Sequence, residues 1–229
     1  MKQFLILASL ISGLAGSSQA ANLILNGSFE TQTPVVLFDD YSVTNVVPSW
    51  TVGVNKVAIL NNIRGAAAEG DNLVQLDAEF INSTLWQDVT TIAGVSYNLS
   101  LQYTPRPGVN TTAQPFSPAF PADTNDVEVW ADGVLLATLG GEGSEVDVSG
   151  GTPPGTYPTN WTPYTYNFVA SGATTKIEFR AAGTADGFGG YIDDVKLSVP
   201  EGGSAALLLA TGLLGLEGAR RRLKALAQA

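Results

Sequence analysis

Apolar and polar residues alternate one by one along several stretches in the middle of the chain. In residues 95–103, Val, Tyr or Leu occupies every odd-numbered position, and Ser, Asn or Gln occupies the positions between them. Residues 176–181 repeat the pattern, with Ile177, Phe179 and Ala181 on one side and charged residues on the other. Because successive side chains of a strand point to opposite faces, this period of two predicts strands with one buried face.

Other stretches extend the prediction to a fold. Residues 125–139 are typical of a hairpin, since Asp132 and Gly133 supply a two-residue turn between two apolar runs. No stretch before residue 204 has a convincing helical period. About ten short strands separated by Gly, Pro and Asn predict an all-β fold, a β-sandwich of the jelly-roll type. The remaining strands are expected at residues 23–26, 56–60, 72–76, 86–89, 164–169 and 191–198.

The two ends of the chain have a different composition from the middle. Residues 1–20 combine a basic start at Lys2, an apolar run and a small-residue site at 18–20, which predicts a secretory signal peptide; a buried N-terminal helix is the alternative. Residues 21–199 then form the predicted β-sandwich domain, and residues 200–229 a hydrophobic segment with an Arg cluster.

The C-terminal segment is short for a membrane span. Its apolar run, residues 205–219, is 15 residues long, or about 23 Å of helix, whereas the hydrocarbon core of a bilayer is about 30 Å thick. Arg220, Arg221 and Arg222 would stay on the cytoplasmic side. This pattern favours a hydrophobic sorting helix that inserts transiently and is then removed. A permanent anchor and a helix of the domain are the alternatives.

The composition limits the chemistry. The chain has no His and no Cys, so Ser-His-Asp and Cys-His catalysis are excluded and a zinc site is not expected. Its net charge of −10 argues against nucleic-acid binding, which needs a basic surface. The composition does not exclude catalysis by a pair of carboxyl groups, nor the binding of a divalent cation or a neutral glycan.

Several short motifs occur in a recognisable order. "NLILNGSFE" (22–30), "LWQDVTTIAGVSYNLSLQYTPRPG" (85–108) and "GYIDDVKLS" (190–198) are the clearest. This order resembles the bacterial secreted jelly-roll domains of the galactose-binding-like superfamily, in particular the choice-of-anchor proteins. It is more distantly similar to carbohydrate-binding modules of families 4 and 9. The resemblance implies a non-catalytic binding or matrix domain, in many members with a structural calcium ion.

The tail resembles the PEP-CTERM class of sorting signals, with "VPEGGS" (199–204) in place of Pro-Glu-Pro. The resemblance implies processing by a sorting peptidase of the exosortase type. It also implies a location in the cell envelope or extracellular matrix of a Gram-negative-type bacterium.

Two carboxylates are candidates for a Ca²⁺ site. Alternation in residues 191–197 places Asp193 on the same face as Tyr191, Val195 and Leu197, so it should be buried. A buried carboxylate needs a partner, and the family pattern offers Glu30 at the end of the first motif. Glu30 and Asp193 would then share Ca²⁺ as a structural cofactor. The alternative is that backbone N–H groups or an arginine satisfy Asp193.

The predicted ligand-binding residues are Trp130, Arg106, Trp86 and Tyr103. Trp130 alternates against buried valines and should project from the opposite face, where an indole can stack on a sugar ring; Trp86 follows the same logic. Arg106 lies between two prolines in "YTPRPG", which begins at Tyr103 and holds the guanidinium in place. The alternatives are a covered face for the tryptophans and a salt bridge for the arginine.

The sequence therefore predicts a secreted, non-catalytic protein that binds carbohydrate or exopolysaccharide, or has a structural part in the matrix. A different class, a secreted glycan-active hydrolase, would use a carboxylate pair drawn from Asp71, Asp77, Glu79 and Asp88. A surface protein without a small ligand is a third possibility.

The tail generates the first testable prediction. Protein purified from its native host should end near residues 200–204, because the marginal apolar run and its Arg cluster suit a signal that is cleaved after export. Intact-mass measurement of the extracellular or matrix fraction tests this. A membrane-bound species that retains Arg220–Arg222 would make the tail an anchor instead.

Overall fold

The computed structural model describes residues 21–31, 41–62, 65–78, 80–110, 122–143, 145–147 and 159–200. Residues Asn22–Ser198 form one compact unit. The predicted signal peptide and residues 201–229 of the predicted sorting segment lie outside the described residues. Within the described part of the chain, no helix is long and apolar enough to cross a membrane.

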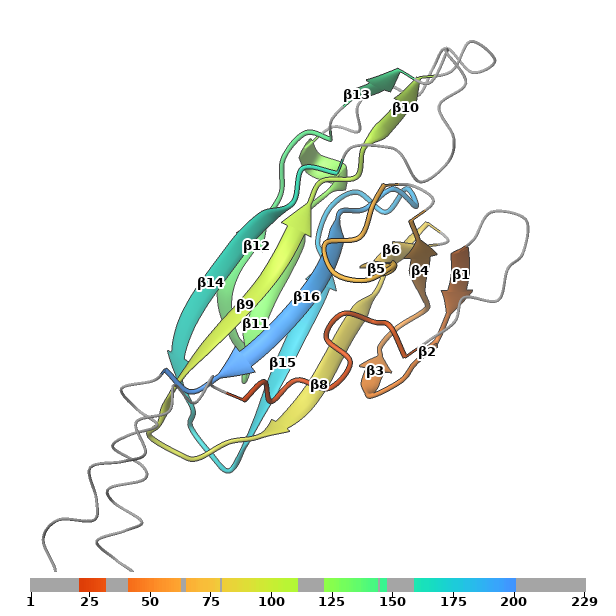
Figure 1. The fold of residues 1–229 in the computed structure, drawn as a ribbon. Helices are drawn as coiled ribbons and strands as arrows, with labels where there is room; N and C mark the ends of the chain where they lie inside the picture. The colour runs from red at the N-terminus through yellow and green to blue at the C-terminus, as the bar shows by residue number, and fades with distance from the viewer. Residues whose placement is uncertain are drawn as a thin grey trace, which may run out of the picture. The chain divides into compact units, whose positions relative to one another are not determined.

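Two antiparallel six-stranded sheets make up most of the described structure, and they lie face to face (Figure 1). The first sheet has the order β1 (Tyr41–Thr44), β4 (Val57–Asn61), β5 (Asn72–Gln75), β16 (Tyr191–Ser198), β9 (Ser96–Thr104) and β14 (Thr162–Val169). The second sheet has the order β12 (Val134–Leu139), β11 (Val127–Ala131), β15 (Thr174–Ala181), β8 (Thr84–Thr90), β3 (Trp50–Val52) and β2 (Val46–Val47).

Shorter elements lie outside these sheets. A small hairpin joins β6 (Asp77–Ala78) to β7 (Ile81–Asn82), and β10 (Gly108–Asn110) pairs in parallel with β13 (Glu145–Asp147). A 3₁₀ turn, η1, spans Ala122–Thr124. The first of these, the β6–β7 hairpin, bears on the candidate site below.

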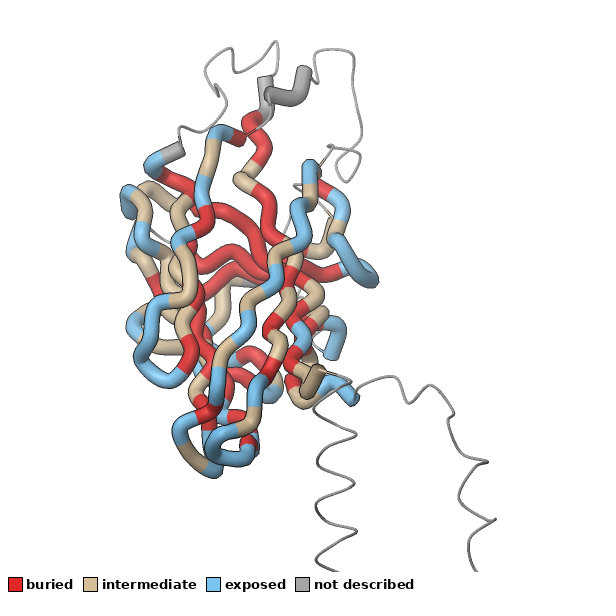
Figure 2. Tube along the Cα trace, turned by 90° about the vertical axis from the view of Figure 1, so that its left-hand side faces the viewer, coloured by how far each residue is buried: buried red, intermediate tan, exposed pale blue. Residues whose placement is uncertain are grey.

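The core lies between the two sheets, and it follows from the alternation in the sequence. In β9, Leu99, Leu101 and Tyr103 are buried, and in the facing sheet Val129 and Phe179 are buried as well. Figure 2 shows that the buried segments of the described chain, coloured red, lie mostly in its interior. Burial of such side chains is worth about 1.5–3 kcal/mol each, and it is the main force that holds the sheets together. The predicted β-sandwich fold is thereby confirmed.

The predicted strands agree with the structure except near the N-terminus. The hairpin turn has positive φ at both Asp132 (50°) and Gly133 (79°), as a two-residue turn of type I′ requires. The expected strand at residues 23–26 is wrong: these residues carry no strand, although the Leu23 N–H donates to the Leu197 carbonyl at 2.8 Å. Instead, the Asn22 side chain accepts from the N–H groups of Ile24 and Leu197.

The alternation expected for β16 does not hold along its whole length. The register against β9 shifts by one residue between Asp193 and Lys196, and Asp194 has a positive φ of 49°. A bulge of this kind inserts an extra residue and reverses which side chains face inward. Asp193 is therefore not on the core face with Leu197, as the simple alternation predicts, but on the outer face of the first sheet with Tyr191.

Candidate ligand-binding site

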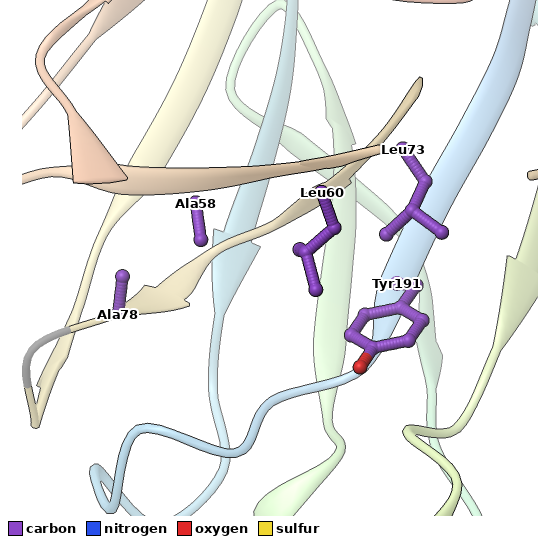
Figure 3. Packing of buried hydrophobic residues seen from close by; sticks show 5 residues of the cluster. All are labelled: Ala58, Leu60, Leu73, Ala78 and Tyr191. Atoms are coloured by element: carbon purple, nitrogen blue, oxygen red, sulfur yellow. The ribbon is translucent and has the colours of Figure 1, made fainter. Parts of the chain in front are cut away.

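The outer face of the first sheet carries an apolar cluster. In β4, the inward-facing residues Val57 and Ile59 are buried. The outward-facing residues Ala58 and Leu60 are buried too. An outward face of a sandwich is normally polar and wet, so other parts of the chain must cover this one. Figure 3 shows the cluster, which consists of Ala58, Leu60, Leu73, Ala78 and Tyr191.

Part of the cover is the loop of residues 65–71. Its Ala66 carbonyl accepts hydrogen bonds from Trp161 Nε1 (2.8 Å) and Thr159 Oγ1 (2.7 Å), and Trp161 packs against the apolar cluster. Further along, the N–H groups of Ala68 and Glu69 donate to the Asp193 carboxylate. The loop is thus held to the sheet at two points, both on the outer face.

The rest of the outer face is open and forms a pocket of about 370 Å³. A pocket of that volume is in the range of small-molecule sites, which are mostly apolar with a few polar groups that orient the ligand. This one has that composition, since three of its side chains are polar or charged. It is lined by Val43, Ala58, Leu60, Gln75, Ala78, Phe80, Arg106, Asp186, Gly187 and Phe188.

Arg106 lies in the pocket and its position is fixed by several contacts. Its Nη1 donates to Gln75 Oε1 at 2.8 Å and to the Gly187 carbonyl at 3.0 Å. Its backbone N–H donates to Asn125 Oδ1 at 2.9 Å. The guanidinium carbon is 4.8 Å from the centroid of the Phe188 ring. A guanidinium that is already oriented loses little conformational entropy when it donates further hydrogen bonds.

Phe80 is the exposed aromatic residue at the pocket. It lies in the turn of the β6–β7 hairpin, where the residue is 70% exposed and has a positive φ of 62°. A bulky residue rarely adopts positive φ, and such strain is concentrated at functional sites. Gly187, which itself has a φ of 83°, lies next to it: a Cβ added there would be 3.8 Å from the Phe80 ring. The turn therefore holds an aromatic ring in water at the pocket.

Two acidic residues lie at the same place. Asp77 is buried, with 1% exposed, and its Oδ2 accepts from the N–H groups of Asp186 (3.0 Å) and Gly187 (2.9 Å). Asp186 lines the pocket and accepts from the Phe188 N–H at 3.0 Å. Burial raises the pKa of Asp186, and the nearby Asp77 carboxyl raises it further, against the effect of the Phe188 N–H. Both carboxyl groups thus hold the loop that forms one wall of the pocket.

The four predicted ligand-binding residues do not come together. Arg106 is at the pocket, but Tyr103 is 1% exposed in the core and cannot contact a ligand there. The reason is that alternation in β9 continues to its end. Burial raises the pKa of Tyr103, whose hydroxyl donates to the Asn125 carbonyl at 2.8 Å. Since Asn125 also binds the Arg106 backbone, Tyr103 acts on the pocket at most indirectly.

Trp86 and Trp130 lie together on the outer face of the second sheet, away from the pocket. Both are opposite Glu178 of β15 in the register. Lys176 Nζ is 4.2 Å from the centroid of Trp86, and Arg180 Cζ is 4.2 Å from that of Trp130. One face of each ring is therefore occupied by a cation.

Glu178 connects these two cations. Its Oε2 is 2.9 Å from Arg180 Nη2 and 3.5 Å from Lys176 Nζ. Burial by itself raises the pKa of Glu178, but the hydrogen bond from Arg180 and the two positive charges outweigh it and lower the pKa. Trp130 Nε1 donates to Glu128 Oε2 at 2.8 Å. This surface is a connected network of ion pairs and rings, which differs from the pocket in chemistry and location.

Glu30 and Asp193 hold the same loop from two sides. The Asp193 carboxylate, which is fully buried, accepts from Ala68 N (2.8 Å), Glu69 N (3.0 Å) and its neighbour Asp194 N (2.6 Å). Glu30 Oε1 accepts from Asp71 N (2.9 Å), at the end of the loop, and from Asn72 N (2.6 Å), the first residue of β5. Asp193 is thus satisfied by backbone N–H groups, which is the alternative that the sequence leaves open.

Burial raises the pKa of Asp193 to about 7, although three N–H groups act in the opposite direction. A buried carboxylate that ionises so reluctantly fits a site for a cation or a proton. Among the described residues, however, no group of three or more Asp and Glu side chains could hold a metal ion. Calcium at Glu30 and Asp193 would need backbone carbonyls for most of its ligands.

Four polar or aromatic residues of the pocket are not among those predicted from the sequence: Gln75, Phe80, Asp186 and Phe188. Gln75 interrupts an apolar run in residues 72–76, and Phe188 stands among the glycines of residues 183–190. A polar residue in an apolar run and an aromatic residue among glycines are weak indications of a binding site. Phe80 lies in a turn where no periodicity applies, so only the structure places it.

Comparison with known proteins gives one match to a family model. The model described as the VPDSG-CTERM motif matches residues 198–223. The chain thus ends in a C-terminal sorting motif similar to the PEP-CTERM signals. No curated protein matches the sequence.

Several solved structures are similar to the chain. A family 61 carbohydrate-binding module in complex with β-1,4-galactotriose has 18% identity and a TM-score of 0.43, over 79% of this chain and 100% of that one. A family 16 module has 13% identity and a TM-score of 0.42, over 77% and 99%. A family 35 module from Clostridium thermocellum has 12% identity and a TM-score of 0.39, over 70% of this chain and 93% of that one. At these identities and TM-scores the likeness carries no argument about a ligand.

The buried carboxylate generates a prediction about pH. Asp193 binds its proton more tightly in the folded than in the unfolded chain, so its contribution to stability is complete below about pH 4 and is lost as the pH rises towards 7. In chelator, the free energy of unfolding should therefore fall over this interval by a few kcal/mol, at about 1.4 kcal/mol per pH unit.

Denaturant unfolding at several pH values measures this loss. The change Asp193→Asn should remove the pH-dependent part. The matched change Asp194→Asn should keep most of it, because the Asp194 carboxylate pairs with Lys196 and its charge raises the pKa of Asp193 far less than burial does. Equal pH profiles for the two variants would contradict the assignment.

Proposed function

We propose that this protein is exported and binds a glycan, without catalysing a reaction on it, in the pocket on the outer face of the first sheet. The observation that carries the proposal is that an exposed aromatic residue, Phe80, and an oriented guanidinium, Arg106, line the same pocket, which has a suitable size. A sugar ring has an apolar C–H face and a rim of hydroxyl groups, so it needs an aromatic surface and a few polar groups.

Each group has a distinct part in this proposal. Phe80 offers the surface on which a pyranose ring stacks. Arg106 would donate hydrogen bonds to sugar hydroxyl groups. Gln75 is buried and holds Arg106 in place, because its Oε1 accepts from Arg106 Nη1 at 2.8 Å while its Nε2 donates to the carbonyls of Asp77 and Gly187. Asp186 would accept hydrogen bonds from sugar hydroxyl groups. Because the pocket combines one cation and one carboxylate with mostly apolar walls, it suits a neutral glycan.

The arrangement of carboxyl groups favours binding over hydrolysis. A glycosidase needs two carboxyl groups that face the scissile bond. Asp186 lines the pocket, but Asp77 is buried and its Oδ2 is engaged by two N–H groups. Of the other acids proposed from the sequence, Asp71 lies in the loop held by Glu30, Asp88 is exposed on the second sheet, and residue 79 lies outside the described residues.

The C-terminal sorting motif supports a location for the protein outside the cytoplasm. A signal peptide and the C-terminal motif together would bring the domain across the inner membrane, and an exosortase-type peptidase would release or transfer it. The domain would then act in the envelope or extracellular matrix of a Gram-negative-type bacterium, on a polysaccharide such as an exopolysaccharide.

Calcium at Glu30 and Asp193 is part of the proposal as a structural cofactor. The support is the buried Asp193 carboxylate, whose raised pKa a divalent cation would lower. The ion would neutralise the charge beneath the loop of residues 65–71. It would hold the loop in place and so keep one side of the outer face covered.

Retention on immobilised polysaccharide tests the pocket. Phe80→Ala should weaken binding about five-fold or more, because a stacked aromatic ring is worth about 1 kcal/mol or more. Ile81→Ala is the matched control, since Ile81 is the next residue of the hairpin and is 48% exposed. Trp130→Ala tests the second sheet: if it weakens retention and Phe80→Ala does not, the pocket is the wrong surface.

Thermal unfolding tests the calcium site. Ca²⁺ binds only the folded chain, so chelator should lower the melting temperature of the wild type. Glu30→Gln should reduce this effect, while Glu142→Gln, which also neutralises an exposed glutamate, should leave it unchanged. A wild-type melting temperature that does not respond to chelator rules out the ion.

A further inference from the structure

The β6–β7 hairpin carries two side-chain oxygen atoms that are buried and lack a partner. Asp77 Oδ1 and Asn82 Oδ1 have no hydrogen-bond partner among the described residues. A buried acceptor without a partner costs free energy, so such atoms usually mark a missing water or ion. The two residues are directly opposite each other in the hairpin register.

Both side chains point towards the same loop. The other carboxylate oxygen of Asp77 accepts from the N–H groups of Asp186 and Gly187, at 3.0 and 2.9 Å. The amide nitrogen of Asn82 donates to the Gly183 carbonyl at 2.6 Å, which also fixes which atom of the amide is oxygen. Since opposite residues of a hairpin project from the same face, the two free oxygens lie between the hairpin and the loop of residues 183–187.

A third acceptor comes from the loop itself. Asp186 lies directly at Asp77, since its backbone N–H donates to Asp77 Oδ2 at 3.0 Å and the two carboxyl groups are within hydrogen-bond reach of each other. The space between hairpin and loop therefore contains two carboxyl groups and one amide oxygen. A water molecule could donate only two hydrogen bonds to these three acceptors, whereas a divalent cation can bind all three oxygens.

We propose that Asp77, Asn82 and Asp186 form a binding site for Ca²⁺ between the β6–β7 hairpin and the loop of residues 183–187. Its ligand atoms are all oxygens from Asp and Asn side chains, which is the set that a hard divalent cation such as Ca²⁺ prefers. Backbone carbonyls of the loop and water complete the shell. This site is separate from Glu30 and Asp193, which hold a different loop.

The site has a consequence for the pocket. The hairpin carries Phe80, and the loop carries Asp186, Gly187 and Phe188, all of which line the pocket. An ion between the two segments ties them together, so it holds Phe80 at a fixed position relative to the loop of residues 183–187. The metal site itself does not depend on the proposed glycan function, and the experiment below measures the metal without any glycan.

Isothermal titration with CaCl₂ of the metal-free, full-length protein tests the site. Asp186→Asn keeps the backbone N–H groups but removes one carboxylate ligand, so it should weaken Ca²⁺ binding roughly tenfold or more, because ligand charge sets the affinity. Asp88→Asn, which neutralises an exposed acid in β8 of the second sheet, is the matched control. Hydrogen exchange of residues 183–187 should slow when Ca²⁺ is added to the wild type, and the slowing should be lost in Asp186→Asn.

Glu30→Gln separates the two candidate sites. This variant should still bind one Ca²⁺ ion with unchanged exchange protection of residues 183–187. If neither the wild type nor Glu30→Gln binds Ca²⁺, or if Asp186→Asn binds it as the wild type does, the proposal is overturned and a water or a shared proton occupies the space. Loss of glycan retention with intact Ca²⁺ binding would affect the proposed function but not this site.

Discussion

The bulge in β16 is the feature on which the outer face of the first sheet depends. One extra residue between Asp193 and Lys196 reverses the alternation of the strand, so that the odd-numbered residues face opposite sides of the sheet before and after the bulge. After the bulge, Leu197 faces the core. Before it, Tyr191 and Asp193 face outward. Without the bulge, Tyr191, Asp193 and Leu197 would share one face, so either the Asp193 carboxylate would enter the core or Leu197 would leave it.

The outward direction of these two side chains gives this face its unusual character. Tyr191 provides the centre of an apolar cluster, and Asp193 provides a buried acceptor that captures the N–H groups of Ala68 and Glu69. The loop that covers Asp193 leaves the other half of the face open, and that half is the pocket. The outward direction of Tyr191 and Asp193 thus accounts for both the covered part of the face and the pocket.

The loops around the pocket follow one physical rule: acidic side chains bind runs of backbone N–H groups that no strand partner can satisfy. Glu30, Asp77 and Asp193 each accept from two or more N–H groups of a distant loop. In a chain with a net charge of −10, these carboxylates hold loops at a high electrostatic cost. Sites where such costs accumulate are where a divalent cation stabilises a protein most.

The strands, the hairpin turn at Asp132 and Gly133 and the sandwich fold could be predicted from the sequence, because they follow from local periodicity and turn preferences. Asp193 could be predicted to be buried for the same reason, although on the wrong face, since a bulge leaves no mark in a pattern of apolar residues. Tyr103 and Arg106 stand close together in sequence, but only Arg106 reaches the pocket, because alternation sends the tyrosine into the core.

The candidate site itself was decided by the tertiary structure. Phe80, Gln75 and Asp186 come from a hairpin turn, a strand and a loop that are far apart along the chain, and no local pattern relates them. The local order of residues is enough to predict which segments become strands and which strand faces are apolar, because both properties depend on neighbouring residues. Which loops meet over the open half of a sheet depends on strand order and register, and those are set by contacts between distant residues.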